Sequence, residues 1–158
     1  MTDPAVLKAR DREALERWPS LASSNPEIVA TLSHFPGRLD RFVRYYAQVV
    51  EEGLTPRRLK DVMERRVAEL HELERRGELP SDPGALEPPE GLADDELALV
   101  RFIDAYAIDH NNVPEAIFAE LHRHFSAAEL TEILWTTAVT RSMSRVAGVL
   151  GLEFATSG

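Results

Sequence analysis

Two arginines near the end of the chain, Arg141 and Arg145, are the side chains best placed to do chemistry. They lie one helical turn apart and continue an apolar stripe that begins with Leu134 and Ala138, so both are directed toward a core. A charge on such a stripe is costly unless it is compensated. Because two neighbouring guanidiniums can grip a carboxylate or an enolate, the pattern predicts a pocket for an anionic small molecule.

Two other interpretations of these arginines stay open. They could pair with carboxylates of the chain itself, such as Asp61, Glu64 or Glu69, or extend to an edge of the helix with only their alkyl stems buried. They could also contact a second copy of the chain.

Three of the five histidines are candidates for acid–base chemistry. His34 lies near a helix C-terminus, which favours a partly positive imidazole, while His71 follows the stripe of its helix and His110 lies at a helix end. The other two are expected at the surface or at an interface. No pair of histidines and no acidic cluster has the spacing of metal ligands, so we expect neither a metal nor a cofactor.

Three aromatic side chains are candidate walls of the anion pocket: Tyr45, Tyr46 and Trp135. The two tyrosines are expected at the core and its rim rather than as acids or bases. Asp61 is a further candidate for moving a proton.

The composition indicates a globular protein with its own core. The chain has 158 residues, of which 44% are hydrophobic and 28% charged. A net charge of −9 argues against general nucleic-acid binding and against anionic membrane surfaces. We expect a cytoplasmic protein, because no membrane span and no secretory signal is evident. The absence of cysteine excludes disulfides, thiolate metal sites and thiol nucleophiles.

Apolar residues recur with a helical period along almost the whole chain, which predicts a single all-α domain of six or seven helices over residues 1–158. Residues 1–24 are expected to hold a peripheral helix and a break. Residues 81–91 form the longest loop, because three prolines and two glycines exclude a helix. The other helices are expected to start near Asn25-Pro26, Pro36, Thr55-Pro56, Ala93, Pro114 and Ser126, the last with a Ser126–Glu129 capping box.

Two stretches of the chain carry a family resemblance. The first runs from Asn25 to Leu70 and ends in "RVAEL"; the second runs from Leu92 to Glu153 and contains "HFSAAELTEI" and "SRVAGVLGLE". In order and spacing they resemble the carboxymuconolactone decarboxylase family, also called alkylhydroperoxidase-D-like. The resemblance covers about two-thirds of the chain.

The resemblance implies a Cys-x-x-Cys motif and a histidine directly after "RVAEL", and this chain departs from it there. The cysteine positions fall near Leu73 and Arg76 and the histidine position near Pro80, whereas Asp61 matches the family's upstream carboxylate. The helix that normally follows the cysteines is replaced by the loop at 81–91. Thiol-dependent peroxide reduction is therefore excluded, because it requires a thiolate.

With thiol chemistry excluded, the activity that the resemblance still implies is that of the family's cofactor-independent decarboxylase branch. We expect a lyase or isomerase that acts on a small carboxylated or cyclic substrate by acid–base chemistry, in a pocket between the third, fourth and last predicted helices. The alternative is a non-catalytic descendant that binds a small molecule or serves as a structural partner. The resemblance also implies a homo-oligomer.

Overall fold

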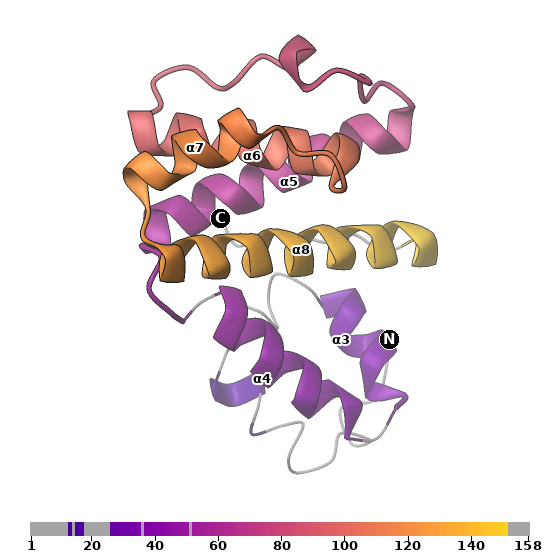
Figure 1. Ribbon diagram of the computed structural model, residues 1–158. Helices are drawn as coiled ribbons and strands as arrows, with labels where there is room; N and C mark the ends of the chain where they lie inside the picture. The colour runs from indigo at the N-terminus through magenta and orange to yellow at the C-terminus, as the bar shows by residue number, and fades with distance from the viewer. Residues whose placement is uncertain (1–12, 14, 18–25, 36, 51, 152–158) are drawn as a thin grey trace.

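The computed structural model describes residues 13, 15–17, 26–35, 37–50 and 52–151 (Figure 1). All regular structure in this part of the chain is helical, which confirms the predicted all-α fold. The elements are α3 (Pro26–Ser33), α4 (Arg38–Val50), α5 (Arg57–Arg76), the 3₁₀ turn η2 (Pro83–Ala85), α6 (Asp94–Asp109), α7 (Glu115–His124) and α8 (Ala127–Leu150).

Local signals set the helix ends close to their predicted places. α5 ends at Gly77, whose φ of 71° is a left-handed conformation that glycine adopts without strain. α8 begins with the predicted capping box, in which Ser126 Oγ accepts from the Glu129 amide at 3.3 Å and Glu129 Oε2 accepts from the Ser126 amide at 2.9 Å. Most of the predicted N-terminal helix, and Pro36, lie outside the described residues; residues 13 and 15–17 are helical.

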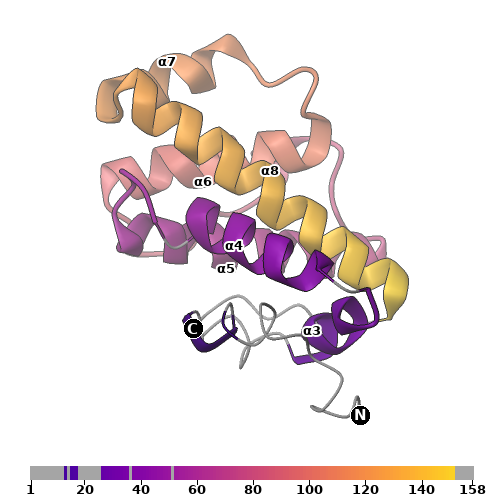
Figure 2. The same cartoon turned by 90° about the horizontal axis from the view of Figure 1, so that it is seen from below.

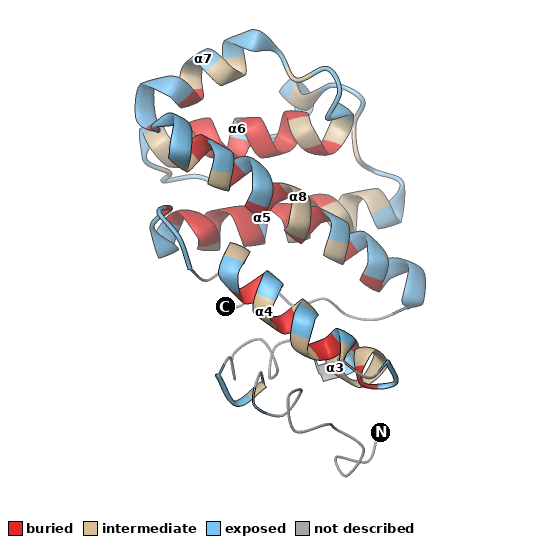
Figure 3. Ribbon diagram, turned by 60° about the horizontal axis from the view of Figure 1, so that its bottom comes forward, coloured by how far each residue is buried: buried red, intermediate tan, exposed pale blue. Residues whose placement is uncertain are grey.

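α8 lies between two groups of helices (Figures 1 and 2). α5, α6 and α7 pack on one side around a core that includes Leu70, Phe102 and Ile133. α3 and α4 pack on the other side around a second cluster, to which α8 contributes Val139 and Met143. Figure 3 shows that the buried residues concentrate on α5, α6 and the inner faces of α8.

A buried ion pair ties the start of α5 to α8. Lys60 is 1% exposed, and its Nζ lies 2.8 Å from Glu132 Oε1. The same carboxylate accepts from the Leu54 amide at 2.5 Å and the Thr55 amide at 3.2 Å. Gly53 has a φ of 118°, which residues with a side chain rarely adopt, and a Cβ there would lie 2.3 Å from Glu132 Oε1, so a substitution would strain the turn and displace the carboxylate. The pair therefore fixes both the α4–α5 turn and the position of α5 along α8.

A long connection, residues 77–93, joins α5 to α6 and is called the strap here. It contains the loop predicted at 81–91 and crosses over the end of the molecule that holds α6 and α7 (Figure 1). Leu79 and Leu86 pack against the first core cluster, and the Asp82 side chain accepts from the Gly84 amide at 2.9 Å. The strap is thus held by apolar contacts and by its own turn.

The outer face of α8 leaves large apolar side chains in contact with solvent. Trp135 is 59% exposed, Val146 48% and Val149 88%. Neither α8 nor any other helix in the described part of the chain is long and apolar enough to cross a membrane. The homo-oligomer stays a prediction, and these side chains are where such a contact is expected.

We expect Glu132→Gln to lower the free energy of unfolding by about 3–5 kcal/mol, because it leaves Lys60 buried without its counter-charge. Glu120→Gln is the matched control. Its partner Arg123 has a side chain 69% exposed, so little change is expected. Urea denaturation followed by circular dichroism measures both, and equal losses would contradict the role of the buried pair.

Candidate functional site

Three of the predicted site residues come together around one carboxylate, Glu74. Its Oε2 lies 2.9 Å from Arg141 Nη2, and its Oε1 lies 2.9 Å from Arg145 Nη2. His71 lies one turn earlier on α5, with Nδ1 3.8 Å from Glu74 Oε2. The two arginines are side by side, as predicted, but a carboxylate of the chain already lies between them.

The carboxylates suggested as partners for these arginines pair elsewhere. Asp61 Oδ1 lies 2.7 Å from Arg57 Nε, and Glu64 Oε2 lies 3.5 Å from Arg57 Nη2. Glu69 Oε2 lies 2.9 Å from Arg66 Nη1. The choice of these three carboxylates as partners was wrong, because the sequence does not give the offset between α5 and α8 along their axes. The two helices run in the same direction from the tie at Lys60, which brings the arginines level with a later part of α5.

Burial differs sharply between the two arginines. The Arg141 side chain is 4% exposed and the Arg145 side chain 51%. Burial lowers the pKa of the Arg141 guanidinium, and the charge of Glu74 opposes this. Burial also disfavours the ionised form of Glu74. The hydrogen bond from Arg145 and the charges of both arginines outweigh this effect, so the pKa of Glu74 lies below its ordinary value of 4.5.

The other predicted site residues do not join this cluster. His34 and His110 are exposed near the ends of α3 and α6. Tyr46 is buried on α4, with its ring 5.6 Å from that of Phe42, whereas Tyr45 and Trp135 are exposed. Asp61 precedes His71 by ten residues of α5, or about 15 Å. Of the residues predicted to surround a pocket between α4, α5 and α8, only His71, Arg141 and Arg145 lie close together.

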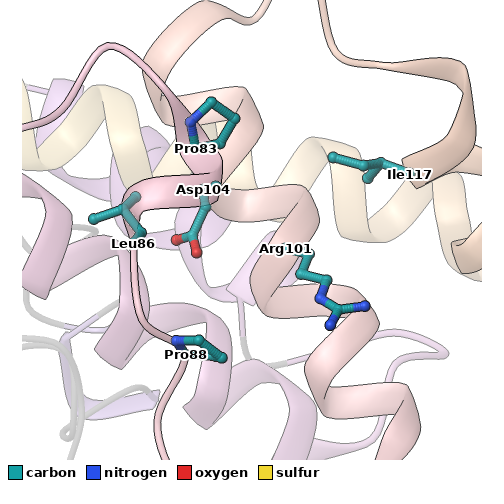
Figure 4. Close-up of a pocket in the computed structure, with 7 residues that line it drawn as sticks. Pro83, Leu86, Pro88, Arg101, Asp104 and Ile117 are labelled. Atoms are coloured by element: carbon teal, nitrogen blue, oxygen red, sulfur yellow. The ribbon is translucent and has the colours of Figure 1, made fainter.

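A pocket of about 360 Å³ lies beneath the strap (Figure 4). One wall comes from the strap and the other from α6 and α7. Its lining is mostly apolar, with one cation and one carboxylate: Pro83, Gly84, Leu86, Pro88, Arg101, Asp104 and Ile117.

The carboxylate of this pocket belongs to a buried ion pair between α5 and α6. Arg66 Nε donates to Asp104 Oδ1 at 2.7 Å and Nη2 donates to Oδ2 at 2.9 Å. Arg66 Nη2 also donates to the Glu87 carbonyl oxygen of the strap at 3.3 Å. Burial raises the pKa of Asp104 and Arg66 opposes that shift. Arg66 also lines a second pocket of about 280 Å³, whose wall includes later residues of the strap. The ion pair therefore separates two pockets, with Asp104 in one and Arg66 in the other.

The cation of the pocket is left uncompensated. Arg101 is exposed and makes no hydrogen bond or ion pair with any described residue. Asp104, one turn further along α6, has both oxygens engaged by Arg66. Figure 4 shows the Arg101 side chain directed away from Asp104. The pocket therefore carries one free positive charge at its rim, although the chain as a whole is strongly acidic.

Sequence reasoning missed the residues of this pocket, although one signal was present. Arg66 lies between Met63 and Leu70 on the apolar stripe of α5, and Asp104 follows Ile103 in the most apolar part of α6. Opposite charges on two such stripes indicate a buried pair. Nothing in the sequence marks Arg101, because the pocket depends on how the strap folds back over α6, which the local pattern does not predict.

The chain matches no family model, no curated protein and no solved structure. The resemblance to the carboxymuconolactone decarboxylase family thus stays a prediction. Among the described residues, no three histidine, aspartate or glutamate side chains are grouped so that they could hold a metal ion. The site must therefore be judged on its own geometry.

Glu74→Gln should lower the free energy of unfolding by roughly 3 kcal/mol, because Arg141 would stay buried with no counter-charge. Arg145→Gln removes a half-exposed partner of the same carboxylate and should cost less than about 1 kcal/mol. Chemical denaturation of the two variants compares them directly. If Arg145→Gln proved the more damaging, the exposed pair would be the important one.

Acid should destabilise the fold through the same carboxylate. A carboxyl group with a depressed pKa in the folded state stabilises the fold above its unfolded pKa and loses this effect as the pH falls through its folded pKa. For Glu74 the loss is expected below about pH 4.5. Urea titrations between pH 3 and 6 should show a shallower acid-side slope for Glu74→Gln than for the wild type. Identical slopes would mean that Glu74 titrates normally.

Proposed function

We propose that this protein binds a compact organic anion, an apolar body carrying one carboxylate, in the pocket beneath the strap. The observation that carries the proposal is the unpaired guanidinium of Arg101 at the rim of a mostly apolar hollow. A few well-placed polar groups in an apolar pocket are what orients a small ligand in most binding sites.

The walls support the apolar part of this ligand. Pro83, Leu86 and Pro88 of the strap line the pocket on one side, and Ile117 of α7 lines it on the other (Figure 4). A volume of about 360 Å³ lies near the lower end of small-molecule sites. It suits an aromatic or alicyclic ring with a short substituent.

The charges support the carboxylate. Arg66 compensates Asp104, so Arg101 is the charge of the pocket that a ligand can meet. A guanidinium can bind a carboxylate with two parallel hydrogen bonds. The net charge of −9 repels anions from most of the surface. This favours a ligand with a single negative charge that contacts Arg101.

A second candidate is cofactor-independent lyase or isomerase chemistry at the Glu74 cluster. It is favoured by the separation of 3.8 Å between His71 Nδ1 and Glu74 Oε2, which places two groups that can exchange protons beside two guanidiniums. Against it, both oxygens of Glu74 are already paired with the arginines, and neither arginine lines any of the three pockets described by the structure. The absence of cysteine excludes thiol peroxidase chemistry for either site.

Calorimetric titration with benzoate, cyclohexanecarboxylate and benzamide tests the binding proposal. The carboxylates should bind and the neutral amide should not. Arg101→Gln should weaken carboxylate binding about 10- to 100-fold, since a charge-assisted hydrogen bond contributes roughly 1.5–3 kcal/mol. Its melting temperature should not change, because Arg101 holds no other residue. Arg123→Gln, an exposed arginine of α7, is the control.

Three further outcomes test where and how the ligand binds. Ile117→Trp should abolish binding by filling the pocket, and equal affinity for benzoate and benzamide would refute the role of Arg101. Binding that survives in Arg101→Gln but is lost in Arg145→Gln would move the site to the Glu74 cluster.

A further inference from the structure

A line of residues runs along the outer face of α8, away from both core clusters (Figure 3). Ile133 of α8 packs in the first cluster, and Val139 and Met143 pack in the second. The line recurs at alternate steps of three and four residues and consists of Ala128, Thr131, Trp135, Ala138, Ser142, Arg145 and Val149. All are exposed except the half-buried Ala138, and together with the exposed Val146 they are called the outer stripe here. Alternate steps of three and four are the spacing by which one helix packs along another.

The outer stripe, all of whose residues the structure describes, carries no unpaired charge, although 28% of the chain is charged. The charged residues of α8 all have partners within the chain: Glu129 with Ser126, Glu132 with Lys60, and Arg141 and Arg145 with Glu74. The exposed face of α5, by contrast, carries charged side chains such as Arg65 and Arg75. Depletion of charge marks the centre of protein–protein interfaces, and an exposed tryptophan such as Trp135 is a typical anchor there. The outer stripe therefore has the character of an interface.

The outer stripe is complementary in size to a second copy of itself that lies antiparallel across it. With a two-fold axis beside Ala138, each large side chain meets a small one of the second copy: Trp135 meets Ser142, Val146 meets Thr131 and Val149 meets Ala128. Large residues opposite small ones let two helices interdigitate at close range. A parallel copy would instead place like residues opposite each other, with two Trp135 rings at one level.

The charges of α8 favour the same orientation. Glu129 and Glu132 lie in its N-terminal half, and Arg141 and Arg145 lie in its C-terminal half. An antiparallel copy brings the half-exposed Arg145 beside Glu132 of the second copy, whereas a parallel copy would bring guanidinium against guanidinium. Opposite charges across an interface select its orientation, because like charges at close range are costly.

We propose that this chain forms a two-fold dimer through the outer stripe, with α8 of one copy antiparallel to α8 of the other. The contact runs from Ala128 to Val149, which is about 30 Å of helix. A two-fold contact uses the same surface on both copies, so it closes at two chains. This surface is separate from the strap pocket, and the dimer does not depend on the proposed function.

Sedimentation equilibrium at micromolar concentration tests the dimer. The wild-type protein should sediment as two chains of 17.7 kDa. Trp135→Glu should weaken the dimer about 30-fold or more, because it replaces the central aromatic anchor by a charge. Tyr45→Glu is the matched control, since it adds the same charge at an exposed aromatic residue of α4, and it should stay dimeric.

Both glutamate variants should keep the helix content of the wild type in circular dichroism, because both side chains are largely exposed. A dimer that Trp135→Glu leaves intact would overturn the proposal. A monomeric wild-type protein would also overturn it, and would leave the outer stripe to a protein of another kind.

Single cysteines test the orientation, because the natural chain contains none. Ala138→Cys should form a disulfide-linked dimer under mild oxidation, since the two-fold axis brings this position close to itself. Val149→Cys should link to Ala128→Cys in a mixture but not to itself, because the two Val149 positions lie about 33 Å apart in an antiparallel pair. A disulfide between two copies of Val149→Cys, or no disulfide in Ala138→Cys, would overturn the proposal.

Discussion

Arg66 and Asp104 face each other in the interior with both carboxylate oxygens engaged, and the strap pocket is built on this ion pair. The pair joins α5 to α6, and Arg66 also holds the strap through the Glu87 carbonyl oxygen. Because Asp104 is compensated there, Arg101 alone gives the pocket its charge. In a chain of net charge −9, this pairing is what leaves the pocket with one positive charge and no free carboxylate.

α5 meets its two neighbours through charged side chains as well as through apolar ones. It pairs with α6 at Arg66, and with α8 at Lys60 near its start and at Glu74 near its end. Buried ion pairs add little net stability, but breaking one by removing a single partner is costly. Their consequence here is geometric, because two ties along one interface exclude a shift of α5 against α8.

Local sequence patterns were enough to predict the helices and their ends. The period of the apolar residues, the Ser126–Glu129 capping box and the glycine after α5 act within a few residues, so they can be predicted from local pattern. The sequence also predicted that two arginines on the stripe of α8 need compensation, since a buried charge must be paired wherever it lies. It placed the longest loop correctly, because prolines exclude a helix in any tertiary context.

Which residues these features bring together depends on how the helices pack. Glu74 compensates the arginines because α5 runs parallel to α8 from a tie at Lys60, and helix period alone does not fix the offset between two helices. Arg101 lines a pocket because the strap passes over α6. The predicted aromatic walls, Tyr45, Tyr46 and Trp135, point elsewhere for the same reason. Contacts between distant segments depend on how helices pack, and many packings are compatible with the same local pattern.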